Sequence, residues 1–224
     1  MLNTTNLFSE LLLNWWSKNK RSFPWRETND AYSILVAEVL LHRTKASQVE
    51  PVFVEFLASF PTPSSLSTTS LEEIQKILYP LGLCWRTKLM HEMANEILQK
   101  FGGEIPAKKE FLMTLPGVSD YIASAVMCFA YHCNEPLLDT NTVRVIGRVL
   151  DIKITDGSRR SIQFKRAYLK LQGTKKVVAR EFAFAMLDFA ALVCLPKKPL
   201  CEQCKVRDVC KYRAHTKQKI EAII

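Results

Sequence analysis

The sequence predicts an all-α fold of about ten helices, and three observations lead to that prediction. Apolar residues recur with helical spacing over most of the 224 residues, whereas the alternating pattern of strands is scarce. Only seven glycines are present, and we find no internal repeat and no low-complexity tail. The composition, 48% hydrophobic and 24% charged, is typical of a globular protein and excludes a largely disordered chain.

The helices can be predicted one after another along the chain. Apolar positions between Leu7 and Trp16 mark a first amphipathic helix, and a nearly continuous apolar run predicts a buried helix over residues 32–41. Residues 60–70, rich in Pro, Ser and Thr, predict a loop that ends at Ser70, a suitable N-cap for the next helix. Later helices are predicted over residues 89–101, stopped by Gly102 and Gly103, and over 110–115, 120–131, 142–150, 164–171 and 179–193.

The charge balance favours a polyanionic partner. The formal net charge is +9 and the pI is about 9.2, and a basic protein gains free energy when it displaces counterions from phosphates. A basic protein with no nucleic-acid role is the alternative at this point. No segment approaches the roughly 20 apolar residues that span a membrane, and the first residues lack a basic signal-peptide start. We therefore expect a cytoplasmic, nucleoid-associated protein.

Four of the seven cysteines crowd near the C-terminus. They are Cys194, Cys201, Cys204 and Cys210, with six, two and five residues between them. A zinc site usually has two short Cys-x2-Cys pairs, and only one pair is short here, whereas a cubane takes one thiolate per iron corner. The spacing therefore favours a [4Fe–4S] cluster over zinc. Two disulfides are disfavoured because the N-terminal residues do not suggest secretion.

A Pro-Gly hairpin is predicted between two helices at residues 115–121, whose sequence is LPGVSDY. Such a turn lets the backbone approach a ligand closely. The N–H groups of Gly117, Val118 and Ser119 lie at the start of the next helix, where they offer a site for a DNA phosphate. The alternative is a simple connector between the helices.

The hairpin, Asp139 and the cysteine spacing together resemble the helix-hairpin-helix DNA glycosylases, which include endonuclease III and the MutY-type adenine glycosylases. In that superfamily one residue decides whether the enzyme also has lyase activity, and an aspartate lies 18 residues after it. Here these positions are Tyr121 and Asp139, since 139 minus 121 is 18. The resemblance covers nearly the whole chain and includes the segments FPWR at 23–26, EVLLHRT at 38–44 and MLDF at 186–189.

This resemblance implies the architecture and the partner. We expect two helical lobes with a DNA cleft between them. One lobe, residues 29–136, would contain the hairpin, and the other would join residues 1–28 to residues 137–224 with the cluster. The expected partner is double-stranded DNA with a mismatched or damaged base, bound by a monomer.

The resemblance also implies two catalytic carboxylates. Breaking an N-glycosidic bond leaves positive charge on the sugar, which a carboxylate stabilises. Asp139 would do this, although the residues alone favour an N-cap, and the two roles are compatible. Glu38 interrupts an apolar run and would contact or protonate the leaving base, with burial raising its pKa. The alternative for Glu38 is a surface-facing side chain.

Tyr121 decides the reaction subtype, because related enzymes that cleave the strand have a lysine there, and a phenol cannot form an imine. We therefore predict base removal with weak or no lyase activity; a packed aromatic is the alternative. Base flipping leaves a gap in the duplex. By resemblance, Leu83 would fill the gap and His42 would approach the opposite base, and Arg43 and Arg86 are candidate DNA contacts. Ser119 replaces a glycine of the family hairpin, and would be strained if its φ were positive.

Two substrate classes compete. Thymine-DNA mismatch glycosylases of the archaeal Mig type are short and have tyrosine at the position of Tyr121, so thymine or uracil opposite guanine is the predicted target. Adenine glycosylases that act on A·G or A·8-oxoguanine share Glu38 and Asp139, but usually have serine in place of Tyr121 and an additional C-terminal domain. The present sequence ends 14 residues after Cys210 (224 minus 210). A third alternative is a DNA-binding module without catalysis.

Overall fold

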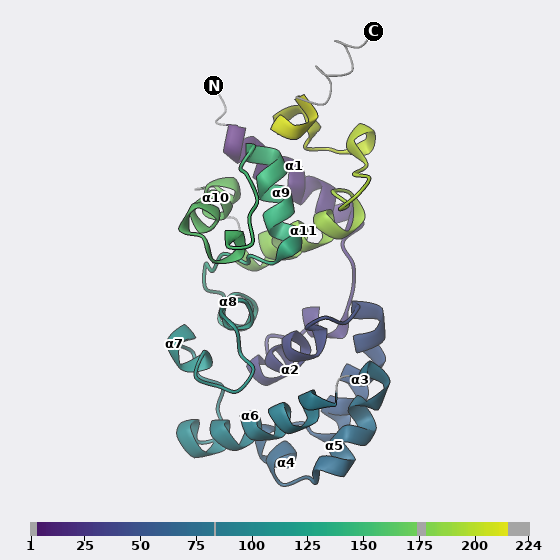
Figure 1. Ribbon diagram of the computed structural model, residues 1–224, viewed down its shortest axis with the longest axis vertical. Coiled ribbons are helices and arrows are strands. Elements are labelled where there is room, and N and C mark those ends of the chain that lie inside the picture. Colours follow the sequence, from purple (N-terminus) through teal and green to yellow (C-terminus); the bar gives the residue numbers. More distant parts are fainter. Residues whose placement is uncertain (1–3, 83, 174–177, 215–224) are drawn as a thin grey trace. The chain divides into compact units, whose positions relative to one another are not determined.

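The computed structural model describes residues 4–82, 84–173 and 178–214, and it contains no strand within those ranges. The all-α prediction is therefore confirmed. The helices are α1 (Thr4–Asn19), α2 (Ala31–Leu41), α3 (Ala46–Ser59), α4 (Pro63–Ser67), α5 (Leu71–Leu78), α6 (Trp85–Phe101), α7 (Lys109–Leu112), α8 (Asp120–Phe129), α9 (Thr140–Leu150), α10 (Ile162–Gln172) and α11 (Ala179–Leu192) (Figure 1). No helix in these ranges is long and apolar enough to cross a membrane.

The chain divides into two compact units. We call Ser22–Cys133 the hairpin unit, because it contains α2 to α8, and we call Met1–Arg21 with Asn134–Ile224 the terminal unit. In Figure 1 the terminal unit combines the purple start of the chain with its green and yellow end. The predicted lobe boundaries and the cleft stay predictions.

The hairpin unit is built around α2, which is buried almost completely. Its N-cap Asp30 accepts a hydrogen bond from the Ser33 N–H at 2.7 Å, and Leu35 and Val36 have no exposed surface. Helices α3 and α8 pack against α2, and α4 and α5 pack against α6. Since all residues from Ile34 to Leu40 are buried, this helix has no exposed polar face to give it an amphipathic pattern.

The terminal unit packs α1 against α10 and α11, and α9 against α11. Asp188 on α11 is fully buried, and it accepts hydrogen bonds from Arg21 Nε at 2.6 Å and Trp16 Nε1 at 2.9 Å. These contacts join the first helix to the last long helix of the unit. Removing either partner would leave the buried charge of Asp188 incompletely compensated, so this connection is costly to break.

Several predicted helix boundaries are confirmed and others are wrong. Ser70 caps α5 through a capping box with Glu73, and Gly102 ends α6 in the left-handed conformation. The predicted loop at 60–70 contains the short helix α4, which begins with a capping box between Thr62 and Ser65. Helix α3 was not predicted; it has Pro51 inside, a residue that usually breaks helices.

Candidate functional site

The hairpin between α7 and α8 depends on Gly117. Its φ is +76°, and a Cβ there would lie 2.4 Å from Cδ2 of Leu89. The Val118 N–H donates to the carbonyl of Leu115 at 3.1 Å, which closes the turn. The position therefore requires glycine for both its conformation and its close packing.

Ser119 is not strained. Its φ is −78°, and its Oγ accepts a hydrogen bond from the Ile122 N–H at 3.3 Å as the N-cap of α8. The strain considered for a positive φ does not arise, because the left-handed residue of the turn is Gly117. Serine is a preferred N-cap, so this departure from the family hairpin supports α8.

Glu38 and Tyr121 lie on two helices that pack together, α2 and α8. Glu38 is only 7% exposed, so the alternative of a surface-facing side chain is excluded. Tyr121 is half-buried in the first turn of α8. A glutamate is rarely buried in a protein, and buried ionisable residues are common at functional sites, so Glu38 is a functional candidate.

Asp139 is the N-cap of α9 in the terminal unit. Its Oδ1 accepts hydrogen bonds from the N–H groups of Asn141 at 2.9 Å and Thr142 at 2.7 Å. Its Oδ2 accepts one from Asn141 Nδ2 at 2.7 Å. Three donors and the start of a helix stabilise negative charge on this carboxylate. The N-cap expected from the residues is confirmed, and Asp139 stays half-buried rather than sealed in the core.

A chain of hydrogen bonds leads from Asp139 to the first clustered cysteine. The Oδ1 of Asn141 accepts from Arg144 Nη1 at 3.0 Å, and Arg144 Nε donates to the Cys194 carbonyl at 2.9 Å. Arg144 Nη2 also donates to the Ala190 carbonyl at 2.9 Å. Arg144 was not predicted as a site residue, although its place three residues after Asn141 on one helix face was a usable signal.

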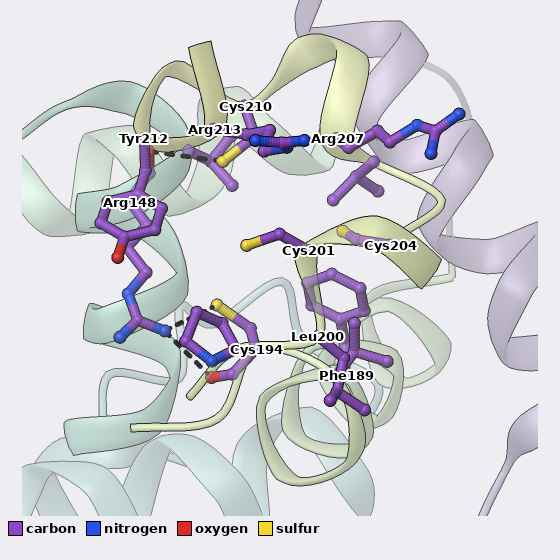
Figure 2. Close-up of a pocket in the computed structure, with 14 residues that line it drawn as sticks. Arg148, Phe189, Cys194, Leu200, Cys201, Cys204, Arg207, Cys210, Tyr212 and Arg213 are labelled. Atoms are coloured by element: carbon purple, nitrogen blue, oxygen red, sulfur yellow. Dashed lines mark hydrogen bonds between the residues drawn. The ribbon is translucent and has the colours of Figure 1, made fainter. Parts of the chain in front are cut away.

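The four clustered cysteines line one pocket. Figure 2 shows the sulfurs of Cys194, Cys201 and Cys210 around a common space, with Cys204 beside Cys201. Within the described residues, no group of three or more His, Cys, Asp or Glu side chains is placed to hold a metal ion. The iron–sulfur and metal-binding predictions therefore stay predictions.

Arg148 forms one wall of this pocket. Its Nη1 lies 3.4 Å from Cys194 Sγ and donates to the Leu195 carbonyl at 2.7 Å, while Nη2 donates to the Pro196 carbonyl at 2.7 Å. Its guanidinium carbon lies 5.2 Å from the centre of the Tyr212 ring. These hydrogen bonds hold the guanidinium of Arg148 in place beside the sulfur of Cys194.

Burial and the neighbouring cysteines raise the pKa values of three of the clustered thiols. The pKa of Cys204 is raised to about 11, chiefly by burial; a hydrogen bond with the Val206 backbone lowers it, and negative charge on Cys210, Cys194 and Cys201 raises it. Burial likewise raises the pKa of Cys201 and of Cys210. A cationic centre bound among these four sulfurs would favour their deprotonated form.

Three other predicted DNA-contacting residues, His42, Arg43 and Arg86, lie at the end of α2 and the start of α6. His42 and Arg43 are exposed, and Arg43 has a φ of +62°. Arg86 is buried, with 1% of its surface exposed, so its side chain is not placed to reach a phosphate in this structure. Leu83, the predicted wedge, lies outside the described residues.

The class of protein follows from comparison with known families. Residues 36–168, more than half of the chain, match the HhH-GPD superfamily of base excision DNA repair proteins. The chain belongs to this superfamily, which confirms the resemblance drawn from its motifs.

Several individual proteins are similar to this chain over nearly its whole length. The chain is 39% identical to the thymine-DNA glycosylase of Aeropyrum pernix, over 90% of this chain and 92% of the relative. It is 38% identical to the thymine/uracil-DNA glycosylase of Pyrobaculum aerophilum, over 92% and 91%. The adenine DNA glycosylase of Mycobacterium tuberculosis is 34% identical, over 90% of this chain but 66% of the relative. The solved structure of a thermostable thymine-DNA glycosylase matches with a TM-score of 0.84 and 32% identity, covering 95% of this chain and 97% of the other.

Proposed function

We propose that this protein is a monofunctional DNA glycosylase of base excision repair, which hydrolyses the N-glycosidic bond of thymine or uracil opposite guanine. The observation that carries the proposal is the carboxylate of Asp139, held by three N–H donors and still half-buried. Superfamily membership and the named thymine and thymine/uracil glycosylases support it.

Asp139 would act on the sugar. As the base departs, positive charge develops on the deoxyribose, and a fixed carboxylate stabilises that charge without reorganising. Its hydrogen bonds to Asn141 and Thr142 fix the orientation of the carboxylate before the reaction. The expelled pyrimidine leaves as an N1 anion and takes a proton later, while water adds to the sugar.

Glu38 would act on the base or on the attacking water. Because thymine and uracil leave as stabilised anions, they need less acid assistance than adenine does. The burial of Glu38 in α2 fits a residue that orients its ligand by hydrogen bonding in a partly dry pocket. Tyr121 offers no amine for imine formation, so the strand would stay intact after the base is released.

Two alternatives stay open to experiment. An adenine glycosylase would share both carboxylates. The similarity to the mycobacterial adenine glycosylase supports this alternative, but with lower identity and over less of the relative than the similarity to the Aeropyrum thymine-DNA glycosylase. A DNA-binding module without catalysis would keep the hairpin and would need Asp139 only as the N-cap of α9.

The Asp139→Asn variant separates catalysis from binding. Asparagine also caps helices, so we expect α9 and the melting temperature to change little. Loss of the negative charge should lower the single-turnover rate at T·G pairs by about 100-fold or more, with DNA affinity retained. Equal product from the variant and the parent protein would contradict the proposed role of Asp139.

We further propose that Cys194, Cys201, Cys204 and Cys210 hold a [4Fe–4S] cluster. The four thiols line one pocket and are the donors such a cluster takes. Bound there, the cluster would cross-link the C-terminal segment without taking part in base removal.

Metal and sulfide analysis tests the cluster. Anaerobically purified protein should contain about four iron atoms and four sulfides per chain and absorb near 400 nm. Cys204→Ser should lower the iron content and the melting temperature. Cys133→Ser is the matched control, because Cys133 is also half-buried but lies in the hairpin unit. Zinc in place of iron, or equal iron in both variants, would contradict the proposal.

A further inference from the structure

A tryptophan lies exposed at the start of α6, beside the turn that follows α2. Trp85 keeps 47% of its surface exposed, which is unusual for so large an apolar side chain. Its ring meets His42 edge to face, with 6.2 Å between the ring centres and 79° between the planes. Neither the fold nor the proposed chemistry accounts for this exposure.

Arg86, at the start of α6, binds the turn that follows α2. Its guanidinium donates to the carbonyl of His42 and, at 2.8 Å, to Oγ1 of Thr44. These two acceptors flank Arg43, whose left-handed backbone needs such support. Arg86 is therefore a positioning residue that fixes the turn, and with it the His42 ring, against the start of α6.

The surroundings of the ring are positively charged. Burial first, and then the charges of Arg43 and Arg86, lower the pKa of His42 below its usual value. Lys88, one helical turn after Trp85, has a side chain that is 75% exposed and whose Nζ lies 3.7 Å from Glu92 Oε1. An exposed aromatic face among cations is the arrangement on which nucleic-acid bases stack while their phosphates are neutralised.

We propose that Trp85 stacks on a nucleotide of the substrate DNA that loses its stacking partner when the target base is turned out. This inference rests on the proposed function, because only a flipped base leaves such a nucleotide in a duplex. The exposed side chains of Arg43 and Lys88 favour DNA over an apolar protein partner. His42 and the buried Arg86 set the orientation of the indole, and Trp85 supplies the contact.

Duplexes with an abasic-site analogue test this contact without any chemistry. The analogue, tetrahydrofuran, is placed next to 2-aminopurine in the same strand, where the fluorescence of 2-aminopurine reports its stacking. Trp85→Ala should weaken binding at least about fivefold and abolish the fluorescence change that the unsubstituted protein produces. Trp85→Phe, which keeps an aromatic ring, should restore most of both.

Phe111→Ala is the matched control, since Phe111 is also 47% exposed and has Lys108 Nζ 5.6 Å from its ring centre. It should change neither signal. Unchanged affinity and fluorescence in Trp85→Ala, or equal losses in Phe111→Ala, would overturn the inference. Base release from T·G duplexes is measured on the same preparations, so that failure of the stacking inference can be distinguished from failure of the proposed function. If the protein releases thymine but Trp85→Ala changes neither affinity nor fluorescence, only the stacking inference is refuted.

Discussion

At the scale of single residues, the sequence was most informative where a side chain conflicts with its surroundings. Glu38 stood out because it interrupts an apolar run, and it is buried. Asp139 was recognisable as an N-cap, and the structure confirms the cap. The buried position of Arg86 was not predictable, because a single arginine after a loop gives no sign of the carbonyl and hydroxyl that bind it.

Tyr121 carries the prediction about reaction subtype. The unsubstituted protein should give no adduct with DNA when borohydride is added, because a phenol forms no imine. Tyr121→Lys places an amine at the start of α8 and should produce a trapped adduct and strand breaks without alkali. Tyr121→Phe is the control and should give neither product. An adduct from the unsubstituted protein would mean that another amine attacks the sugar.

At the scale of elements, local rules predicted helix ends better than helix existence. Caps such as Ser70 and stops such as Gly102 depend on one or two neighbouring residues, so the sequence identifies them. Helix α3 depends on burying Val49, Val52 and Phe53 against the rest of the unit, which offsets the cost of Pro51. Tertiary packing of this kind cannot be seen in a local pattern.

The hairpin offers a prediction at the same scale. Gly117→Ala should lower the free energy of unfolding by about 2–4 kcal/mol, from the left-handed backbone and the contact with Leu89 together. Gly102→Ala is the matched control: its φ is +63° and a Cβ would meet nothing within 4 Å. It should cost only about 1–2 kcal/mol by chemical denaturation. Equal losses would mean that packing against Leu89 does not restrict the hairpin.

At the scale of the whole molecule, composition and motif order predicted the class of fold and the superfamily, and both are confirmed. The partners of buried charges were not predictable, because they come from distant parts of the chain. Asp188 illustrates this: its partners Trp16, on α1, and Arg21 are 172 and 167 residues away. The sequence shows an aspartate in an apolar helix, whereas the structure shows that it joins α1 to α11.

The central claim concerns which base is removed and how. The most direct measurement incubates the protein with labelled duplexes that contain T·G, U·G, A·G and A·8-oxoguanine pairs, each analysed with and without hot alkali. We expect breaks at T·G and U·G only after alkali, because hydrolysis leaves an intact abasic strand. Release of adenine instead would assign the protein to the adenine glycosylases, and breaks at T·G without alkali would contradict the monofunctional mechanism.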